Sequence, residues 1–516
     1  MANKYYDVVV IGAGLAGLTI AGVLASRENK KVLVLDKEKY VGGRLLSFYG
    51  RDNKLFNHQG EQLDVAGFKR NLASVHSWVH SSSPDLETIV GNGMLNGYAF
   101  EAGGTVGFWG NKSRMAFVMN YLNKPVNQAS NQGLMVIGPD GKSKYQLLKG
   151  EKYGWMTDEQ NKVTKRLLAE MLTADASKLE EWDKISLKKW LNDRTSDRTI
   201  YEYIAALAAI HMVIGEPENI SARDFIRFMY TPAKIGMNLL SGSTGVIQNP
   251  GFGYIGTKLA EAVIDNGGEI LLDTKVDQVI FDGNKVKGVQ IGDAVVTAEQ
   301  VVCTLPTRDM FKVVPKDRFD KAFAEHVSKD FLGAGMLSGF VGLSKNILAD
   351  AGAPPKTWIL APSIIKDFEG YVGDVDVICI MPCNHEPSLA PISEGKYNWG
   401  FSIALLDHEM RDRAKVQKVI DRAKEVFYNA FPDMKKNTLW EIWLCSDRGY
   451  GDFPPGGEER PTHTQPNMEG LFFAGDGYGP KVWGAGMDAA IHSAVYCLDE
   501  MTGRKYSEEI LPDYHR

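Results

Sequence analysis

The chain has 516 residues, a formal net charge of −6, and 44% hydrophobic and 24% charged residues. This length exceeds one compact core, so about two domains are expected, and the composition is that of a soluble globular protein. The negative net charge gives no reason to expect nucleic-acid binding. Five cysteines without a repeated spacing predict a reducing, cytoplasmic environment and no disulfide framework.

The apolar stretch 8–25 has the length of a signal-peptide core, but it contains turn-forming glycines and follows an acid, Asp7. A nucleotide-binding element explains these features together, so we predict no targeting segment. No run of about 18 apolar residues occurs elsewhere, and no membrane-spanning helix is expected. Peripheral attachment to a membrane surface stays open.

The first predicted element is a strand–turn–helix–strand unit over 7–36, DVVVIGAGLAGLTIAGVLASRENKKVLVLD. Its glycines, Gly12, Gly14 and Gly17, form G-x-G-x-x-G between an apolar strand and an apolar helix. A second apolar strand ends in Asp36, about 20 residues after the last glycine. Strand, glycine turn, helix, strand and acid in this order predict a dinucleotide-binding βαβ unit.

Each glycine of this unit has its own physical reason. Gly12 permits a tight turn, Gly14 lets a pyrophosphate approach the backbone, and Gly17 lets the helix pack close to the strand. The helix N-terminus offers unpaired N–H groups and the positive end of the helix dipole, which favour phosphate binding. Leu15 and Ala16, between the second and third glycines, are further candidate cofactor contacts.

The end of the second strand and the loop after it are predicted to continue the nucleotide site. Asp36 can accept hydrogen bonds from a ribose 2′-OH and would repel a 2′-phosphate, so a nucleotide of the NADP type is not expected. Lys37 follows as a further candidate contact. Gly42 and Gly43 precede Arg44, which suits a loop that passes close to a diphosphate with arginine as its charge partner.

This order of motifs resembles the flavin amine oxidase and phytoene desaturase superfamily, whose members bind FAD. The resemblance places Arg44 near the FAD phosphates. It implies an α/β fold in which a Rossmann-like FAD-binding domain of the glutathione reductase type is interleaved with an α+β substrate domain that contains a helical insert. The expected FAD-binding domain is 1–60, 240–308 and 465–505, the substrate domain is 96–239 and 309–464, and 45–95 is an insertion.

The family usually has a segment of the form G-x-x-F-[DE]-x-G soon after V-G-G-R. The preferred match is 97–104, GYAFEAGG, which makes Gly103 and Gly104 candidate FAD contacts, and 62–67 is a weaker match. Within the inserted stretch, His76 and His80 are four residues apart. No third ligand is in view, so we interpret the two histidines as an exposed helix face and predict no metal site.

A hairpin and a helical region are predicted in the middle of the chain. Residues 135–148, with PDGK at their centre, read as two strands joined by a turn. The stretch 157–214 is mostly helical and begins with Thr157 and Gln160 in a capping-box pattern. We interpret the methionines and aromatic residues of the helical insert as packed core, with an apolar ligand channel as the alternative.

Residues 249–307 return to alternating helix and strand and resemble the second FAD segment of the family. In that segment the backbone of the valine of T-x-V meets the adenine, and this role maps onto Val276. No second dinucleotide motif that would suit NAD(P)H is present, so the electron acceptor, whether O2, a quinone or a redox protein, stays open.

The last matching segment is a buried strand that ends in Gly475 and Asp476. In the family, the acid at this point contacts the ribityl or pyrophosphate part of FAD. The helix that follows is expected to direct its N-terminus, near Gly486 and Met487, toward the O2 edge of the isoalloxazine, where its dipole stabilises the reduced anion.

Several features depart from the amine oxidases. The position of one tyrosine of their aromatic cage is Gly486 here, and the segment 335–340 lacks their active-site lysine. The cysteine used for covalent flavin attachment is replaced by the pair 448–449, so non-covalent FAD is expected. Aromatic residues considered as pocket candidates are Tyr450, Trp443, Tyr478 and Trp483.

The resemblance and these departures together imply an FAD-dependent oxidoreductase of the desaturase or dehydrogenase type. A hydride would pass from a C–H bond of an apolar unsaturated substrate, isoprenoid, carotenoid or lipid-like, to flavin N5, and no catalytic acid or base would be obligatory. Three alternatives stay open: a flavin amine oxidase, a redox-neutral flavin-dependent isomerase, and a non-enzymatic binder similar to prenyl-protein escort proteins. Retention of Arg44 and Asp476 argues against the binder.

Overall fold

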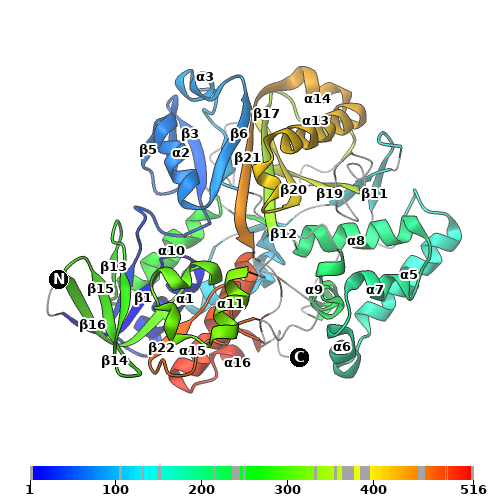
Figure 1. The fold of residues 1–516 in the computed structure, drawn as a ribbon. Coiled ribbons are helices and arrows are strands. Elements are labelled where there is room, and N and C mark those ends of the chain that lie inside the picture. The colour runs from blue at the N-terminus through cyan, green and yellow to red at the C-terminus, as the bar shows by residue number, and fades with distance from the viewer. Residues whose placement is uncertain are drawn as a thin grey trace.

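The computed structural model describes residues 4–103, 107–126, 128–130, 133–138, 140–147, 153–212, 217–234, 244–247, 251–329, 334–353, 357–362, 377–383, 395–450, 460–480, 482, 484 and 486–512. Figure 1 shows a nucleotide-binding half near the N-terminus, a second half built on a larger sheet, and a group of helices beside that sheet.

A seven-stranded sheet forms the nucleotide-binding half. Its strands and the helices packed on them are β1 (Tyr5–Ile11), β2 (Val32–Leu35), β13 (Glu269–Leu271), β14 (Gln278–Asp282), β15 (Lys285–Ile291), β16 (Ala294–Cys303), β22 (Leu471–Phe473), α1 (Leu15–Arg27), α10 (Gly253–Asp265), α15 (Gly486–Thr502) and α16 (Tyr506–Ile510). The order is β13-β2-β1-β16-β15-β14, and β22 also pairs with β16. β13, β2, β1, β16 and β22 are parallel, whereas β14, β15 and β16 form an antiparallel meander.

The apolar runs of the sequence decide this arrangement. Val8, Val9 and Val10 of β1 are all 0% exposed, as expected for a parallel strand that is covered on both faces. α1 is buried over most of its length because it contacts β2 on one side and α10 and α15 on the other. The sheet draws its strands from three separate parts of the chain, and the predicted α/β class with a Rossmann-like half is confirmed.

An eight-stranded sheet forms the second half, in the order β11-β10-β18-β19-β20-β17-β21-β6. Its strands and associated helices are β6 (Ser77–Ser83), β10 (Gly133–Ile137), β11 (Lys144–Leu147), β17 (Ala334–Leu343), β18 (Thr357–Pro362), β19 (Val377–Cys383), β20 (Tyr397–Leu406), β21 (Thr438–Tyr450), α12 (Ile347–Asp350), α13 (Arg413–Ala430) and α14 (Pro432–Asn437). The predicted hairpin over 135–148 is confirmed as β10 and β11.

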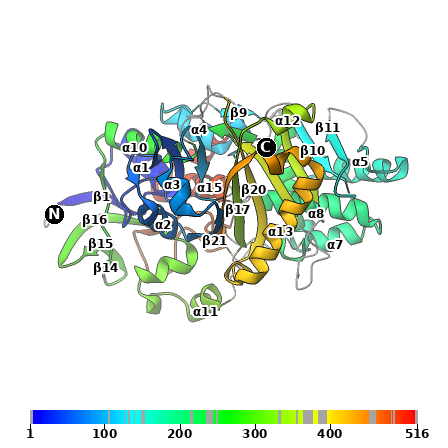
Figure 2. The same ribbon diagram turned by 90° about the horizontal axis from the view of Figure 1, so that it is seen from above.

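The two faces of this sheet have different environments. Leu337 of β17 and Ile403 of β20 pack in a core with Val419 and Ile420 of α13, and Figure 2 shows α13 running alongside β17 and β20. Because successive strand residues point to opposite faces, the neighbouring Met336 points away from α13, toward the nucleotide-binding half.

The stretch 45–95 is built into both halves of the molecule. It contributes β3 (Ser47–Arg51), β4 (Lys54–Asn57), β5 (Gln62–Leu63), α2 (Val65–Ser74) and α3 (Leu86–Gly91), and β3 pairs with β7 (Ala99–Glu101) in a small sheet. Its last strand, β6, pairs with β21 at the edge of the large sheet.

The interpretation of His76 and His80 as an exposed helix face was wrong. α2 ends at Ser74, and His76 follows in a left-handed turn with φ +59°. His80 lies buried in β6, with its Nε2 3.3 Å from Oε1 of Gln417. A spacing of four residues also places two side chains on one face of an extended segment, so the spacing alone could not distinguish helix from strand.

Five helices form the insert that was predicted beside the substrate region: α5 (Asp158–Leu172), α6 (Ala176–Asp183), α7 (Leu187–Asn192), α8 (Arg198–Met212) and α9 (Ala222–Lys234). Figure 1 shows them grouped beside β11 and β19. The predicted capping box of Thr157 and Gln160 is confirmed at the start of α5. Trp190 and Phe225 are 0% exposed in the core of the insert, and α8 contacts β18 and β19.

Shorter elements complete the described chain. They are β8 (Gly107–Phe108), β9 (Gln128–Ser130), β12 (Thr244–Ile247), α4 (Arg114–Tyr121), α11 (Lys321–Lys329) and the 3-10 helices η1 (Gly110–Lys112), η2 (Pro217–Asn219), η3 (Thr307–Lys312), η4 (Lys316–Arg318) and η5 (Glu409–Arg411). Within the described ranges, no helix is both long and apolar enough to cross a bilayer.

A half-buried acid joins the small sheet to α10. Glu101 Oε1 accepts a hydrogen bond from the Phe252 N–H at 3.1 Å, and its Oε2 accepts one from the Ser47 hydroxyl at 2.6 Å. The same hydroxyl oxygen accepts from the Gly253 N–H at 2.8 Å. These contacts satisfy N–H groups at the start of α10 that a helix cannot satisfy itself. Burial raises the pKa of Glu101 to about 7, against the opposing effect of the two hydrogen bonds.

We expect Glu101→Gln to change how stability depends on pH. Because the folded-state pKa lies above the ordinary 4.5, the native chain loses stability as pH rises from about 4.5 through about 7, by at most about 3 kcal/mol. The glutamine variant should lack this loss. Denaturant unfolding of both chains between pH 5 and 8 measures it, and parallel curves for the two chains would contradict the prediction.

Candidate cofactor and active site

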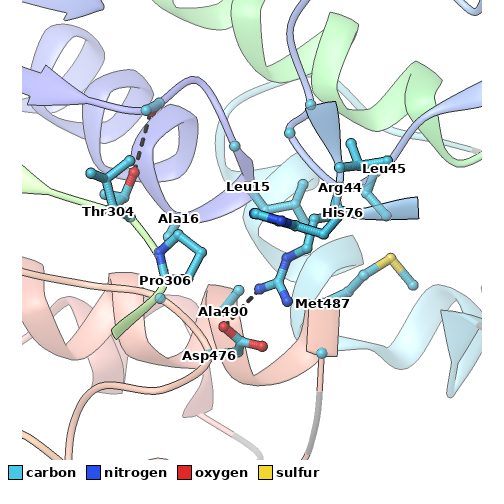
Figure 3. Close-up of a pocket in the computed structure, with 18 of the residues that line it drawn as sticks. Leu15, Ala16, Arg44, Leu45, His76, Thr304, Pro306, Asp476, Met487 and Ala490 are labelled. Carbon is cyan, nitrogen blue, oxygen red and sulfur yellow. Dashed lines mark hydrogen bonds and ion pairs between the residues drawn. The ribbon is translucent and has the colours of Figure 1, made fainter. Parts of the chain in front are cut away.

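A cavity of about 390 Å³ lies between the carboxyl ends of β1 and β2 and the inner face of the large sheet. Figure 3 shows several of its lining side chains. Of the residues predicted to hold the cofactor, those that line the cavity are Gly12, Gly14, Leu15, Ala16, Asp36, Lys37, Gly42, Gly43, Arg44, Val276, Gly475, Asp476, Gly486 and Met487.

The first glycine turn is closed by backbone contacts. Gly12 has φ +111°, and a Cβ built there would overlap the Thr304 hydroxyl, which donates to the Ile11 carbonyl at 2.9 Å. A Cβ at Gly17 would overlap the carbonyl oxygen of Gly12. Gly14 differs, because the nearest atom to a Cβ there is 4.0 Å away. Gly12 and Gly17 therefore make the turn, whereas Gly14 leaves open space beside it.

A second glycine loop lies directly against the first. The Gly42 N–H donates to the Ala13 carbonyl at 2.8 Å, and a Cβ at Gly43 would come within 3.0 Å of the Gly14 Cα. Gly42 and Gly43 both have positive φ, at +103° and +59°, a region that other residues rarely adopt. The two loops together bring the N-terminus of α1 and Arg44 to one wall of the cavity.

Asp36 has a structural role besides lining the cavity. Its Oδ2 accepts from the Ala13 N–H at 2.7 Å, and its Oδ1 accepts from the Glu38 N–H at 2.9 Å. Burial raises the pKa of Asp36, and these two hydrogen bonds oppose the rise. The carboxylate thus ties the glycine turn to the end of β2. Val276 lines the same cavity from the segment between β13 and β14.

Arg44 and Asp476 meet across the cavity from opposite ends of the sequence. The Arg44 guanidinium donates to Asp476 Oδ1 at 2.8 Å, and Figure 3 shows it pointing at the carboxylate. The second oxygen, Oδ2, is buried and has no hydrogen-bond partner among the described residues. Buried carboxylate oxygens normally have partners, so a group bound in the cavity would complete the coordination of Asp476.

The N-terminus of α15 reaches the cavity at Gly486, Met487 and Asp488. Asp488 is 7% exposed and forms an ion pair with Arg114 of α4, which is fully buried. Burial raises the pKa of Asp488, and the arginine opposes that rise.

The described side chains of the large sheet that line the cavity are uncharged. Met336 of β17 lies opposite Ala404 of β20 in the register, and Ser402 lies two residues along on the same face. All three side chains line the cavity. The segment 335–340 was predicted to stand where amine oxidases carry a lysine, and it lies in β17, beside this wall.

α8 of the helical insert closes the cavity with Ala209 and His211. Burial lowers the pKa of His211 to about 4, so the imidazole is neutral near pH 7. Its Nδ1 hydrogen-bonds the Leu207 carbonyl, so Nδ1 carries the proton of the neutral ring. α8 therefore packs in the core of the insert and also forms part of the cavity wall.

Sequence reasoning missed His76 and Asp309, which also line the cavity. His76 Nε2 lies 3.7 Å from Asp309 Oδ2, and Lys312 pairs with Asp309 Oδ1 at 2.9 Å. His76 comes from the turn between α2 and β6, and Asp309 comes from η3. No local motif marks either residue, because their approach depends on how the 45–95 stretch packs on the nucleotide-binding half.

Two aromatic pocket candidates lie away from the cavity lining. Trp443 packs in the core beside Phe401 and Gly339, and its Nε1 donates to Glu441 Oε2 at 3.0 Å. Tyr478 stacks on Phe473 in the core of the nucleotide-binding half.

The remaining candidates are not at the cavity wall or lie outside the described residues. Gly103 approaches the Ser446 hydroxyl and does not line the cavity. Gly104, Trp483 and the side chain of Tyr450 lie outside what the structure describes. Across the described ranges, no cluster of three or more His, Cys, Asp or Glu side chains could hold a metal ion.

The residues at the cavity fit a dinucleotide that carries a diphosphate. α1 begins without a side-chain cap and without an acid in its first turn, so its N-terminal N–H groups suit an anion. Gly14 supplies room at that point, and Arg44 supplies a cation.

Gly14→Ala and Gly17→Ala form a matched pair that separates binding from folding. At Gly14, φ is −80° and the nearest atom to an added methyl group is the Gly43 Cα, at an ordinary contact distance of 4.0 Å. The free energy of unfolding without cofactor should stay within about 0.5 kcal/mol, while FAD affinity falls at least about tenfold. Gly17→Ala should cost about 1–3 kcal/mol of stability because its methyl overlaps backbone. Denaturant unfolding and FAD titration measure both, and unchanged FAD affinity in Gly14→Ala would contradict this assignment.

Comparison with known proteins agrees with this geometry. An NAD(P)-binding Rossmann-like domain model matches residues 10–67, and the model of flavin containing amine oxidoreductases matches 94–497. The chloroplastic prolycopene isomerase of Arabidopsis thaliana is 23% identical, over 96% of this chain and 82% of that protein. Pseudooxynicotine dehydrogenase of a Pseudomonas species is 22% identical, over 77% and 70% of the two chains.

The crystal structure of an oxidoreductase from Methanosarcina mazei superposes with a TM-score of 0.67 at 14% identity, covering 96% of this chain and all of the other. This likeness shows the shared fold. The matches confirm the predicted resemblance, and the predicted oxidoreductase is favoured over the escort-like binder. The chain belongs to the flavin containing amine oxidoreductase family and is a flavin-dependent oxidoreductase.

Proposed function

We propose that the chain binds FAD non-covalently and oxidises an apolar, unsaturated substrate by removing a hydride from a C–H bond. The observation on which this proposal rests is that the cavity has a charged wall and an uncharged wall. The nucleotide-binding half contributes its charged groups, whereas the large sheet contributes Met336, Ser402 and Ala404. Bound FAD would supply the hydride acceptor.

The charged end supports FAD as the flavin. Asp36 stands at the end of β2, where a ribose hydroxyl can donate to it. Arg44 and the start of α1 suit the diphosphate, and Asp476 Oδ2 suits a ribityl hydroxyl. No cysteine is found among the described residues that line the cavity. This supports non-covalent attachment.

The charge pattern favours an apolar substrate over an amine. Three carboxylates that line the cavity are paired with cations: Asp476 with Arg44, Asp488 with Arg114, and Asp309 with Lys312. A substrate ammonium would have to compete with these cations. His211 adds no charge near pH 7, because burial lowers its pKa to about 4. The chain's own residues at this end therefore orient an apolar group and exclude water.

A redox-neutral isomerase is the second candidate. The observation in its favour is the match to prolycopene isomerase, which extends over 96% of this chain. Isomerisation of a polyene would use the same apolar wall, and it differs from oxidation in that the product has the mass of the substrate. A flavin amine oxidase is the third candidate, supported by the family match.

Anaerobic titration of the flavin-loaded protein separates these candidates. We expect a polyunsaturated isoprenoid to bleach the visible flavin band and to lose two hydrogens, one as a hydride to the flavin and one as a proton released to the medium, while primary and secondary amines leave the band unchanged. Bleaching by amines alone would contradict the proposal. An isomer of unchanged mass, formed without net bleaching, would favour the isomerase.

Ala404→Phe tests where the substrate lies. The larger ring would fill space at the uncharged wall, so we expect FAD to be retained and the bleaching rate to fall at least about tenfold, about 1.4 kcal/mol. Ile403→Leu is the matched control, because Ile403 is 1% exposed on the opposite face and its volume is conserved. Equal bleaching rates in both variants would place the substrate elsewhere.

A further inference from the structure

Two buried arginines converge on the start of α15. Arg114 of α4 pairs with Asp488, and Arg460 donates to the carbonyls of Val482 and Gly484 just before the helix. Arg114 is 0% exposed and Arg460 is 7% exposed. Two cations are thus held in a desolvated region directly behind the helix N-terminus that reaches the cavity.

The described residues leave one oxygen of Asp488 without a hydrogen-bond partner. Its Oδ2 pairs with Arg114, whereas its Oδ1 is buried and has no hydrogen-bond partner among the described residues. The residue is 7% exposed and lines the cavity beside Met487. Since buried polar atoms are normally paired, the missing donor is expected to belong to the molecule that occupies the cavity.

The charge of Asp488 also matters for what binds there. A carboxylate in the first turn of a helix is favoured by the dipole, but it opposes any negative charge that develops in front of the helix. Arg114 offsets that carboxylate at hydrogen-bond distance, in surroundings where charges are poorly screened. The balance between the two side chains therefore contributes to the local potential at this end of the cavity.

We propose that Arg114 and Asp488 form a positioning pair that sets the reduction potential of the bound flavin. Arg114 neutralises Asp488 where the negative charge of the reduced flavin develops, and Asp488 Oδ1 accepts a hydrogen bond from an N–H or O–H of the cofactor. This inference rests on the proposed FAD function, and it assigns to two residues outside the recognised motifs a role in the redox chemistry.

The test measures the reduction equilibrium of the flavin-loaded protein against a reference dye. Asp488→Asn removes the negative charge beside Arg114, so the equilibrium should shift toward the reduced flavin by at least about tenfold, which is 29.6 mV for a two-electron couple. In the Arg114→Met background, the same asparagine substitution should shift the equilibrium less than about threefold. Burial raises the pKa of Asp488 and Arg114 opposes that rise, so without the arginine the acid is already neutral and asparagine removes no charge. A purely structural role would not make the shift depend on Arg114.

An unshifted equilibrium in Asp488→Asn, or an equal shift in both backgrounds, would overturn the inference. If Asp488→Asn loses its flavin, Arg114→Lys decides the question. Lysine keeps the positive charge but cannot make the bidentate hydrogen bonds of a guanidinium, so the equilibrium should stay within about threefold of the wild type. A tenfold shift would overturn the role of charge. A wild-type protein that cannot be loaded with FAD would contradict the proposed function. Flavin-loaded variants with an unmoved potential contradict only this inference.

Discussion

The structure depends on the close approach of two glycine loops. Gly12 and Gly17 close the turn after β1, where a Cβ would overlap the Thr304 hydroxyl and the Gly12 carbonyl oxygen respectively. The second loop lies against this turn, and a Cβ at Gly43 would come within 3.0 Å of the Gly14 Cα. This contact brings the start of α1 and the cation of Arg44 to the same wall. A diphosphate can then reach backbone N–H groups that a bulkier loop would cover.

The other walls follow from that contact. Arg44 forms an ion pair with Asp476, which follows the final strand β22 near the other end of the chain. α15 starts shortly afterwards and meets the cavity with its N-terminus. Opposite, β17 and β20 of the large sheet present an uncharged face, and α8 of the helical insert closes the space. The two ends of the cavity, which we propose hold the cofactor and an apolar substrate, are therefore built from different halves of one fold.

The cofactor end could be predicted from sequence because its geometry is local. Short sequence motifs identify this end: a glycine that needs positive φ, an acid that ends a strand, and an arginine after two glycines. The structure brings Asp36, Arg44 and Asp476 to one cavity. We found no comparable sequence motif for the proposed substrate end. Trp443 was a pocket candidate, but the register of β21 turns its ring into the core. His76 reaches the cavity only through a left-handed turn after α2, and the spacing to His80 suggested a helix instead.

The central claim is that this cavity holds FAD without a covalent bond. The most direct measurement is to denature the purified yellow protein, separate the polypeptide from the solution, and identify and quantify the flavin in each fraction. The structure predicts FAD in the solution at a ratio near one per chain, with a colourless polypeptide. Flavin that stays on the polypeptide, release of a flavin other than FAD, or a protein that contains no flavin and cannot be loaded with FAD would contradict it.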